Sequence, residues 1–153
     1  MSLEKIIQAD IMTAMKAKDE VRLLSLRSVK AAITNYKSSP SFSGDKNEDL
    51  DYSVIIKMMQ KMVKERRDTA QIYIDAGRME LAEKELAEAN AIEVYLPKPL
   101  SEEEVIELVK DAMIIVGATS IKDMGKVIAQ VNKTSAGRTD GKTISTIVKR
   151  LLS

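Results

Sequence analysis

The chain is divided at the stretch Tyr95-Leu96-Pro97-Lys98-Pro99-Leu100-Ser101-Glu102-Glu103-Glu104. Its two prolines lack a backbone donor and push the residue before each of them out of the α-helical region, so a helix that arrives from the N-terminal side must end near Leu96. Ser101, followed three residues later by Glu104, predicts a capping box at the start of a new helix. We therefore predict two domains, residues 1–97 and residues 98–153, joined by a packed connection.

Apolar residues recur at helical spacing on both sides of this stretch and predict an all-α protein. The N-terminal domain is predicted to hold about four helices, near residues 3–17, 20–36, 51–75 and 78–96. Three shorter helices, which begin near Ser101, Ser120 and Asp140, are predicted to form a small C-terminal domain. A domain of about fifty residues is marginal on its own, so we expect it to need support from the N-terminal half.

Two of the predicted helices have buried faces that can be specified. The third helix is expected to turn one apolar stripe inward, widened by neighbouring Ile55, Met59 and Val63. The residues of that stripe are Val54, Met58, Met62, Thr69, Ile72 and Tyr73. The fourth helix is expected to bury Met79, Leu81, Ala82, Leu86, Ala89, Ile92 and Tyr95. Because the loop between them is short, the two helices should be antiparallel neighbours.

Composition restricts the chemistry that the chain can perform. Of its 153 residues, 44% are hydrophobic, only 3% are aromatic and nine are methionine, which favours packing of helix on helix. Cysteine and histidine are both absent, which excludes disulfides, Cys-rich zinc sites, and Ser-His-Asp or Cys-His catalysis. No glycine-rich phosphate-binding motif is present. We assign no catalytic residue, no cofactor and no metal ligand, and expect a protein that is not an enzyme by itself.

The sequence also bears on location. No stretch approaches the roughly 20 apolar residues of a membrane span. Glu4 and Asp10 lie where a secretory signal peptide would be apolar. We therefore expect a cytoplasmic protein without a membrane partner. Residues 38–49 are polar and rich in turn formers, with Phe42 as their one large apolar residue, and are expected to form a flexible connection. A cation-binding loop is the alternative, but the EF-hand spacing is missing.

Three motifs in order resemble the YqeY family. They are Tyr95-Leu96-Pro97 before the capped Ser101-Glu102-Glu103-Glu104, then Asp123-Met124-Gly125-Lys126-Val127, then Gly137-Arg138-Thr139-Asp140-Gly141-Lys142. The resemblance runs from near Leu3 to Leu152. It implies a helical N-terminal domain and a small C-terminal domain of the GatB/YqeY type. That domain is similar to the tail of GatB, the B subunit of the glutamine-dependent Asp/Glu-tRNA amidotransferase, where the tail is implicated in holding tRNA.

Basic residues provide a physical basis for RNA contact. From Lys122 to the end of the chain there are seven basic and two acidic residues, an excess of +5, whereas the whole chain carries +1. Such a local excess attracts backbone phosphates. We predict RNA contact through Lys126, Lys133, Arg138 and Lys142, and the amides at the start of the last helix are a further candidate phosphate site. The alternative is structural: Gly137 allows a turn, Asp140 or Thr143 caps the helix, and the lysines are solvated.

Three function classes follow from the sequence. The first is a non-catalytic, tRNA-binding or amidotransferase-related accessory module, whose partner is tRNA or a tRNA-linked protein complex. The second is a protein–protein adaptor that binds no nucleic acid. The third, implied by the family resemblance alone, is a carbon–nitrogen ligase with glutamine as amido-nitrogen donor. No aromatic residue follows Tyr95, so RNA would be recognised by its shape or its phosphates rather than by base stacking on aromatic rings.

Overall fold

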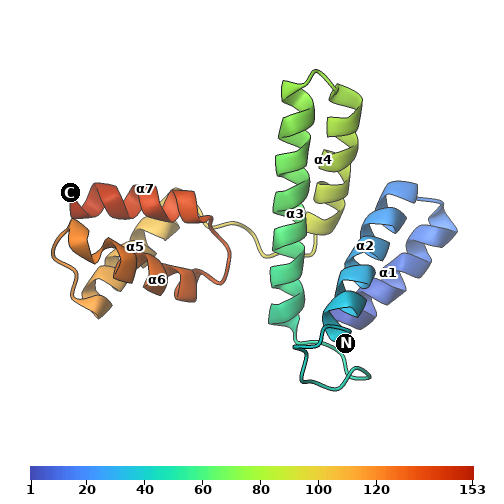
Figure 1. The fold of residues 1–153 in the computed structure, drawn as a ribbon, viewed down its shortest axis with the longest axis horizontal. Coiled ribbons are helices and arrows are strands. Elements are labelled where there is room, and N and C mark those ends of the chain that lie inside the picture. The colour runs from blue at the N-terminus through green and yellow to red at the C-terminus, as the bar shows by residue number, and fades with distance from the viewer. The chain divides into compact units, whose positions relative to one another are not determined.

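The computed structural model describes residues 1–153 and contains only helices, which confirms the all-α prediction. Its contacts divide the chain into two units, Met1–Leu96 and Pro97–Ser153. Unit 1 contains four helices (Figure 1), which are α1 (Leu3–Ala17), α2 (Glu20–Lys37), α3 (Tyr52–Asp75) and α4 (Met79–Glu93). Unit 2 contains α5 (Glu102–Val116), the 3-10 helix η1 (Ile121–Asp123), α6 (Met124–Ser135) and α7 (Gly141–Leu152).

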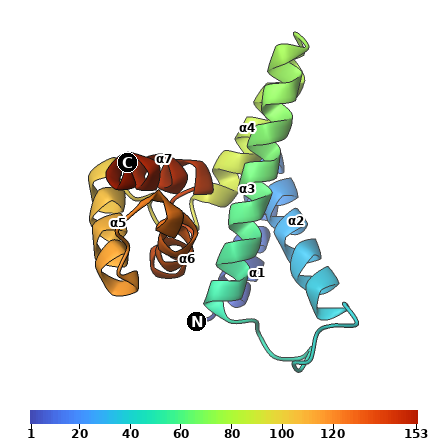
Figure 2. The same ribbon diagram turned by 60° about the vertical axis from the view of Figure 1, so that its left-hand side comes forward.

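Unit 1 consists of two antiparallel helix pairs. Ser2 and Asp19 cap α1 and α2 through their side-chain oxygens, and Lys18 makes the turn between the two helices in a left-handed conformation. The second pair, α3 and α4, is longer than the first and projects beyond it (Figures 1 and 2). The core of the unit is formed where the two pairs meet, and its fully buried side chains include Leu26, Val29, Ile55, Met59 and Ile92.

The inward face of α3 differs from the predicted stripe. The buried residues of α3 are Ile55, Ile56, Met59, Val63 and Ala70, whereas Val54, Met58 and Met62 are half-buried. Ile72, predicted to face inward, is 67% exposed. The reason is that α3 packs against helices on more than one side, so its buried arc is wider than a single stripe and centred one residue further along the chain.

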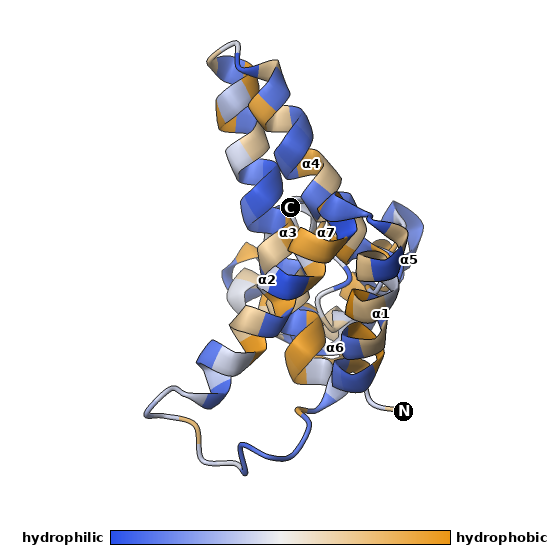
Figure 3. Cartoon of the chain, turned by 90° about the vertical axis from the view of Figure 1, so that its right-hand side faces the viewer, coloured by the Kyte–Doolittle hydropathy of each residue, from blue (hydrophilic) through white to orange (hydrophobic).

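The projecting end of the α3–α4 pair is held by small residues. Ala70 and Ala82 are its buried side chains. Met79 and Leu81, predicted to be buried, are 52% and 39% exposed. Hydrophilic residues predominate along this end of the pair (Figure 3). Because neither α1 nor α2 extends this far, the outer residues of α4 have no third helix to cover them.

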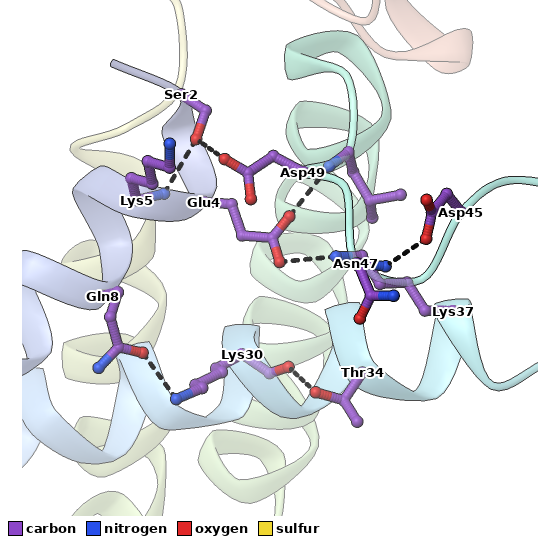
Figure 4. Close-up of polar contacts among 11 residues, drawn as sticks. Ser2, Glu4, Lys5, Gln8, Lys30, Thr34, Lys37, Asp45, Asn47 and Asp49 are labelled. Carbon is purple, nitrogen blue, oxygen red and sulfur yellow. Dashed lines mark hydrogen bonds and ion pairs between the residues drawn. The ribbon is translucent and has the colours of Figure 1, made fainter.

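The loop between α2 and α3 is hydrogen-bonded to the start of α1 through Asp49 and Leu50, just before α3 begins (Figure 4). The Glu4 carboxylate accepts hydrogen bonds from Lys37 Nζ at 2.8 Å and from the Leu50 amide at 2.9 Å, and Ser2 donates to Asp49. Within the loop, the Phe42 ring contacts Tyr36 edge-on, with ring centroids 5.5 Å apart. This loop was predicted to be a flexible connection, whereas these hydrogen bonds fix its ends.

The end of unit 1 is also anchored. Helix α4 ends at Glu93, three residues before the predicted limit, and the amides of Tyr95 and Leu96 continue in turn hydrogen bonds to Ile92 and Glu93. The Tyr95 hydroxyl donates to the Asp10 carboxylate of α1. Burial and this hydrogen bond raise the pKa of Tyr95 to about 12. The last residues before Pro97 therefore belong to the packed body of unit 1.

Candidate nucleic-acid interface

Unit 2 is built from three helices around an aliphatic core. Val105 and Val109 of α5, Val127 and Val131 of α6, and Ile144 and Val148 of α7 are all fully buried. The predicted capping box is present: Ser101 Oγ accepts from the Glu104 amide at 3.2 Å, and Glu104 Oε1 accepts from the Ser101 amide at 3.1 Å. Gly117 then ends α5 in the left-handed conformation. The shared core holds α6 and α7, which carry the three predicted lysines, against α5.

The predicted lysines lie on the outer sides of their helices. Lys126 and Lys133 are both exposed on α6, opposite the buried Val127 and Val131. Because they are seven residues apart, they lie about two helical turns apart on one side of the helix. Lys142, in the first turn of α7, is exposed as well, and Lys149 follows it at the same spacing. Each helix thus carries a pair of lysines away from the core.

Arg138 differs from these lysines, because its side chain and backbone hold the loop before α7. Its Nε donates to the Lys98 carbonyl at 2.9 Å, and its amide donates to the Ser135 carbonyl at 3.0 Å. Its own carbonyl accepts from the Leu100 amide at 2.8 Å. Arg138 was predicted to contact RNA together with the three lysines, and in the structure this arginine also connects the start of unit 2 to the α6–α7 turn.

At the start of α7, Asp140 caps the helix, as in the structural alternative to a phosphate site. Asp140 Oδ1 accepts from the Thr143 amide at 2.6 Å, so a carboxylate occupies one of the amides considered for a phosphate. Gly137 lies in the left-handed region with φ of 78°, next to Ala136 with φ of 50°, as the tight turn requires. Gly141, by contrast, has no positive φ, and a side chain there would meet no neighbouring atom.

Charge is distributed unevenly among the helices of unit 2. Helix α5 carries five acidic residues and one basic residue, a net charge of −4, whereas the segment from Lys122 onward carries +5. Part of the basic excess is compensated by the negative charge of Asp123, which lies close to Lys126. The backbone hydrogen bond from Thr119, followed by that from Ser120, keeps the pKa of Asp123 low, and Lys126 contributes to the same effect. The basic charge of unit 2 is therefore concentrated on α6 and α7.

A hollow of about 380 Å³ lies beside Arg138 and was not predicted from the sequence. Its lining consists of Leu100, Glu104, Glu107, Leu108, Thr134, Ser135, Ala136 and Arg138. Ser135 is 97% buried, and its hydroxyl has no hydrogen-bond partner within the protein. Glu104 and Arg138 lie in two of the motifs noted in the sequence, but no local pattern brings them together, since the lining residues come from α5, the end of α6 and the loop.

Other kinds of site are not found in the structure. No helix is long and apolar enough to cross a membrane. No three carboxylates lie close enough together to hold a metal ion. A second, smaller hollow of about 240 Å³ lies in unit 1 beside the Glu4 hydrogen bonds, and several of its polar side chains already bond one another: Lys30 Nζ donates to Gln8 Oε1 at 2.6 Å.

Comparison with characterised proteins identifies fungal relatives. The chain is 28% identical over 139 residues to "Altered inheritance of mitochondria protein 41, mitochondrial" of Kluyveromyces lactis, an alignment that covers 90% of this chain and 69% of that protein. The protein of the same name from Eremothecium gossypii is 26% identical over 129 residues, covering 82% of this chain and 68% of the relative. That of Pyrenophora tritici-repentis is 29% identical over 110 residues, with 70% and 57% covered.

These relatives contradict the cytoplasmic location predicted from the sequence, because each of them is named as a mitochondrial protein. The prediction depended on Glu4 and Asp10, which argue only against an apolar secretory signal. Mitochondrial targeting segments are amphipathic and rich in arginine and serine rather than apolar. Charged residues near the start of the chain therefore had no bearing on that possibility.

The match to a protein family covers almost the whole chain. The family model described as "Yqey-like protein" matches residues 4–152, which include both units and all three motifs recognised in the sequence. The match agrees with the resemblance seen in the motifs around Pro97, Gly125 and Gly137. The chain belongs to the YqeY family.

Proposed function

We propose that this YqeY-family protein is a non-catalytic module that contacts structured RNA, with tRNA as the class of partner, through α6 and α7 of unit 2. The observation that carries the proposal is the separation of charge within one small unit: −4 on α5 and +5 from Lys122 onward. Affinity for a polyanion depends on such local excess more than on net charge.

The placement of the lysines supports the same proposal. Lys126 and Lys133 lie on the outer side of α6, and Lys142 and Lys149 on that of α7. A spacing of seven residues in a helix is about 10.5 Å, which suits contact with phosphates a few nucleotides apart along one strand. The lysines of α6 and α7 supply long-range attraction, and the fixed Arg138 supplies a guanidinium of defined position.

The test is designed around the different role of Arg138. Replacement of Lys126, Lys133 and Lys142 by glutamine removes three exposed positive charges and leaves the Arg138–Lys98 hydrogen bond intact. The matched control removes three exposed lysines of unit 1, Lys16, Lys46 and Lys57. Both variants have the same net charge, so only the position of the charges differs between them. Weaker tRNA binding by the first variant alone supports the proposal, and equal effects of the two variants argue against it.

A protein partner is the second candidate, and exposed apolar residues favour it. Ile114 and Ile115 near the end of α5 are 80% and 64% exposed, and Ile121 is 45% exposed. Large aliphatic side chains exposed at neighbouring positions offer an apolar surface that a protein partner can cover. A crosslinked pull-down with and without nuclease separates the candidates. A specific protein that is retained after nuclease treatment, and lost on changing Ile114 and Ile115 to serine, would favour the adaptor.

A further inference from the structure

The hollow beside Arg138 combines hydrogen-bond acceptors, donors and an apolar wall within unit 2. Glu104 and Glu107 project from the first two turns of α5, while Arg138 and Ser135 approach from the α6–α7 turn. Leu100, Leu108 and Ala136 supply the apolar part of the lining. A volume of about 380 Å³ admits a planar ring system of the size of a nucleobase.

The acceptor side of the hollow is formed by Glu107. One oxygen of Glu104 is already occupied, because Oε1 accepts from the Ser101 amide at 3.1 Å. The Glu107 side chain is 71% exposed at the rim of the hollow, and its carboxylate has Lys110 as its cationic neighbour at 4.0 Å. A distance of this size leaves the carboxylate oxygens able to accept two parallel N–H groups from a ligand.

The donor side is formed by Arg138 and by the end of α6. The guanidinium carries five N–H donors, and the Lys98 carbonyl takes the one on Nε. Three hydrogen bonds, through the amide, the carbonyl and Nε, fix this arginine in place. Ser135 adds a buried hydroxyl without a partner, and buried hydroxyls are nearly always hydrogen-bonded. The hollow thus presents the fixed donors of Arg138 beside the carboxylate of Glu107 at its rim.

We propose that this hollow receives an unpaired guanine base of the RNA, an inference that rests on the proposed function. The Watson–Crick edge of guanine presents two adjacent donors, N1–H and the N2 amino group, next to the O6 acceptor. The two donors match the Glu107 carboxylate, and O6 matches the N–H groups of Arg138. The apolar lining from Leu100 and Leu108 packs against the ring and takes the place of the aromatic stacking that the sequence of unit 2 lacks.

The other bases fit this arrangement less well. Uracil offers a single N–H between two carbonyl oxygens, and both oxygens would face a carboxylate. Cytosine and adenine each pair one amino donor with an adjacent ring-nitrogen acceptor, which a carboxylate repels. Guanine alone can satisfy both oxygens of one carboxylate on its Watson–Crick edge. The hollow should therefore distinguish bases, although the lysines on α6 and α7 read only phosphates.

The test compares single-stranded RNA hexamers of equal charge with the full-length protein. Hexauridylate is compared with the same hexamer carrying one central guanosine, adenosine or inosine, by fluorescence anisotropy at low salt. We expect the guanosine hexamer to bind roughly fivefold or more tightly than hexauridylate, as for a bidentate base contact. Inosine, which lacks the N2 amino group, should lose most of that gain.

Matched variants connect the preference to the hollow. Glu107→Gln should abolish the guanosine preference, whereas Glu103→Gln, an exposed glutamate on the same helix outside the lining, should retain it. Each variant removes one negative charge, so a shared rise in affinity for all hexamers cancels in the ratio. Equal binding of all four hexamers by the unaltered protein overturns this inference and leaves RNA binding standing. Absence of binding to any hexamer and to tRNA overturns both.

Discussion

Replacing Ser101 by alanine is expected to destabilise unit 2 by about 1 kcal/mol, the usual contribution of a serine N-cap. The structure defines what is lost: the 3.2 Å hydrogen bond from the Glu104 amide to Ser101 Oγ at the start of α5. Glu104→Ala removes the reciprocal bond at 3.1 Å. Because both bonds belong to one motif, the double variant should be less destabilised than the sum of the single variants.

Native-state hydrogen exchange of the intact chain is a suitable assay, since unit 2 contains no aromatic residue to report its unfolding. The amide of Val109, a fully buried residue in the middle of α5, should exchange roughly fivefold faster in Ser101→Ala, as about 1 kcal/mol implies. Glu103→Ala is the control, because Glu103 is exposed in the same turn and outside the capping box. Equal effects of Glu103→Ala and Glu104→Ala, or full additivity in the double variant, would refute the role assigned to the capping box.

Three further predictions concern the pH dependence of stability in each unit and the loop between α2 and α3. The backbone and side-chain hydrogen bonds from Ser101 lower the pKa of Glu104, so unit 2 should be most stable above the usual glutamate pKa and lose stability as the pH falls below about 4.5. A protection factor at the Val109 amide, corrected for the intrinsic exchange rate, that does not fall in acid would contradict this. In unit 1, burial and the hydrogen bond to Asp10 raise the pKa of Tyr95 to about 12. The contribution of Tyr95 to the stability of unit 1 is therefore complete below pH 10 and is lost as the pH rises through 12. Absorbance titration should show that one of the four tyrosines ionises later than the others, and Tyr95→Phe should remove that late step. Glu4→Ala should release the end of the α2–α3 loop and speed limited proteolysis between Ser41 and Asn47, and an unchanged cleavage rate would show that the Glu4–Leu50 bond does not restrain it.

Local signals in the sequence were sufficient to predict the seven α-helices, but not the 3-10 helix η1, which occupies the segment after Ser120 where α6 was expected to begin. The capping box at Ser101 depends on residues three apart, and the helix break before it depends on the two prolines. Each of these is determined by a few neighbouring residues, so no tertiary knowledge was needed. The helix periodicity was likewise sufficient for the class of fold.

Burial on the longer pair of helices was predicted less well. Ile72, Met79 and Leu81 have the spacing of buried residues but lie where α3 and α4 extend beyond α1 and α2. Whether an apolar stripe is covered depends on the length of the helix opposite it, which periodicity does not contain. The small Ala70 and Ala82, by contrast, are buried because they permit close approach of the two helices.

The sequence identified the exposed lysines of the candidate interface but not the hydrogen bonds that Arg138 makes. The lysines at positions 126, 133 and 142 lie exposed, yet Arg138 is a structural link to Lys98, forty residues earlier. Such a hydrogen bond joins segments distant in the sequence and leaves no local pattern. The hollow lined by Glu107 and Ser135 is also formed by distant segments, so only the folded chain brings its groups together.

Binding of tRNA across a salt series tests the central claim most directly. We predict that the unaltered protein binds tRNA at low salt and that log affinity falls linearly with log salt. Replacing Lys126, Lys133 and Lys142 by glutamine should weaken binding and flatten the slope by about one for each lysine that contacts a phosphate. The control variant of Lys16, Lys46 and Lys57 should keep the original slope. No binding at low salt, or the same slope for all three proteins, would contradict the account.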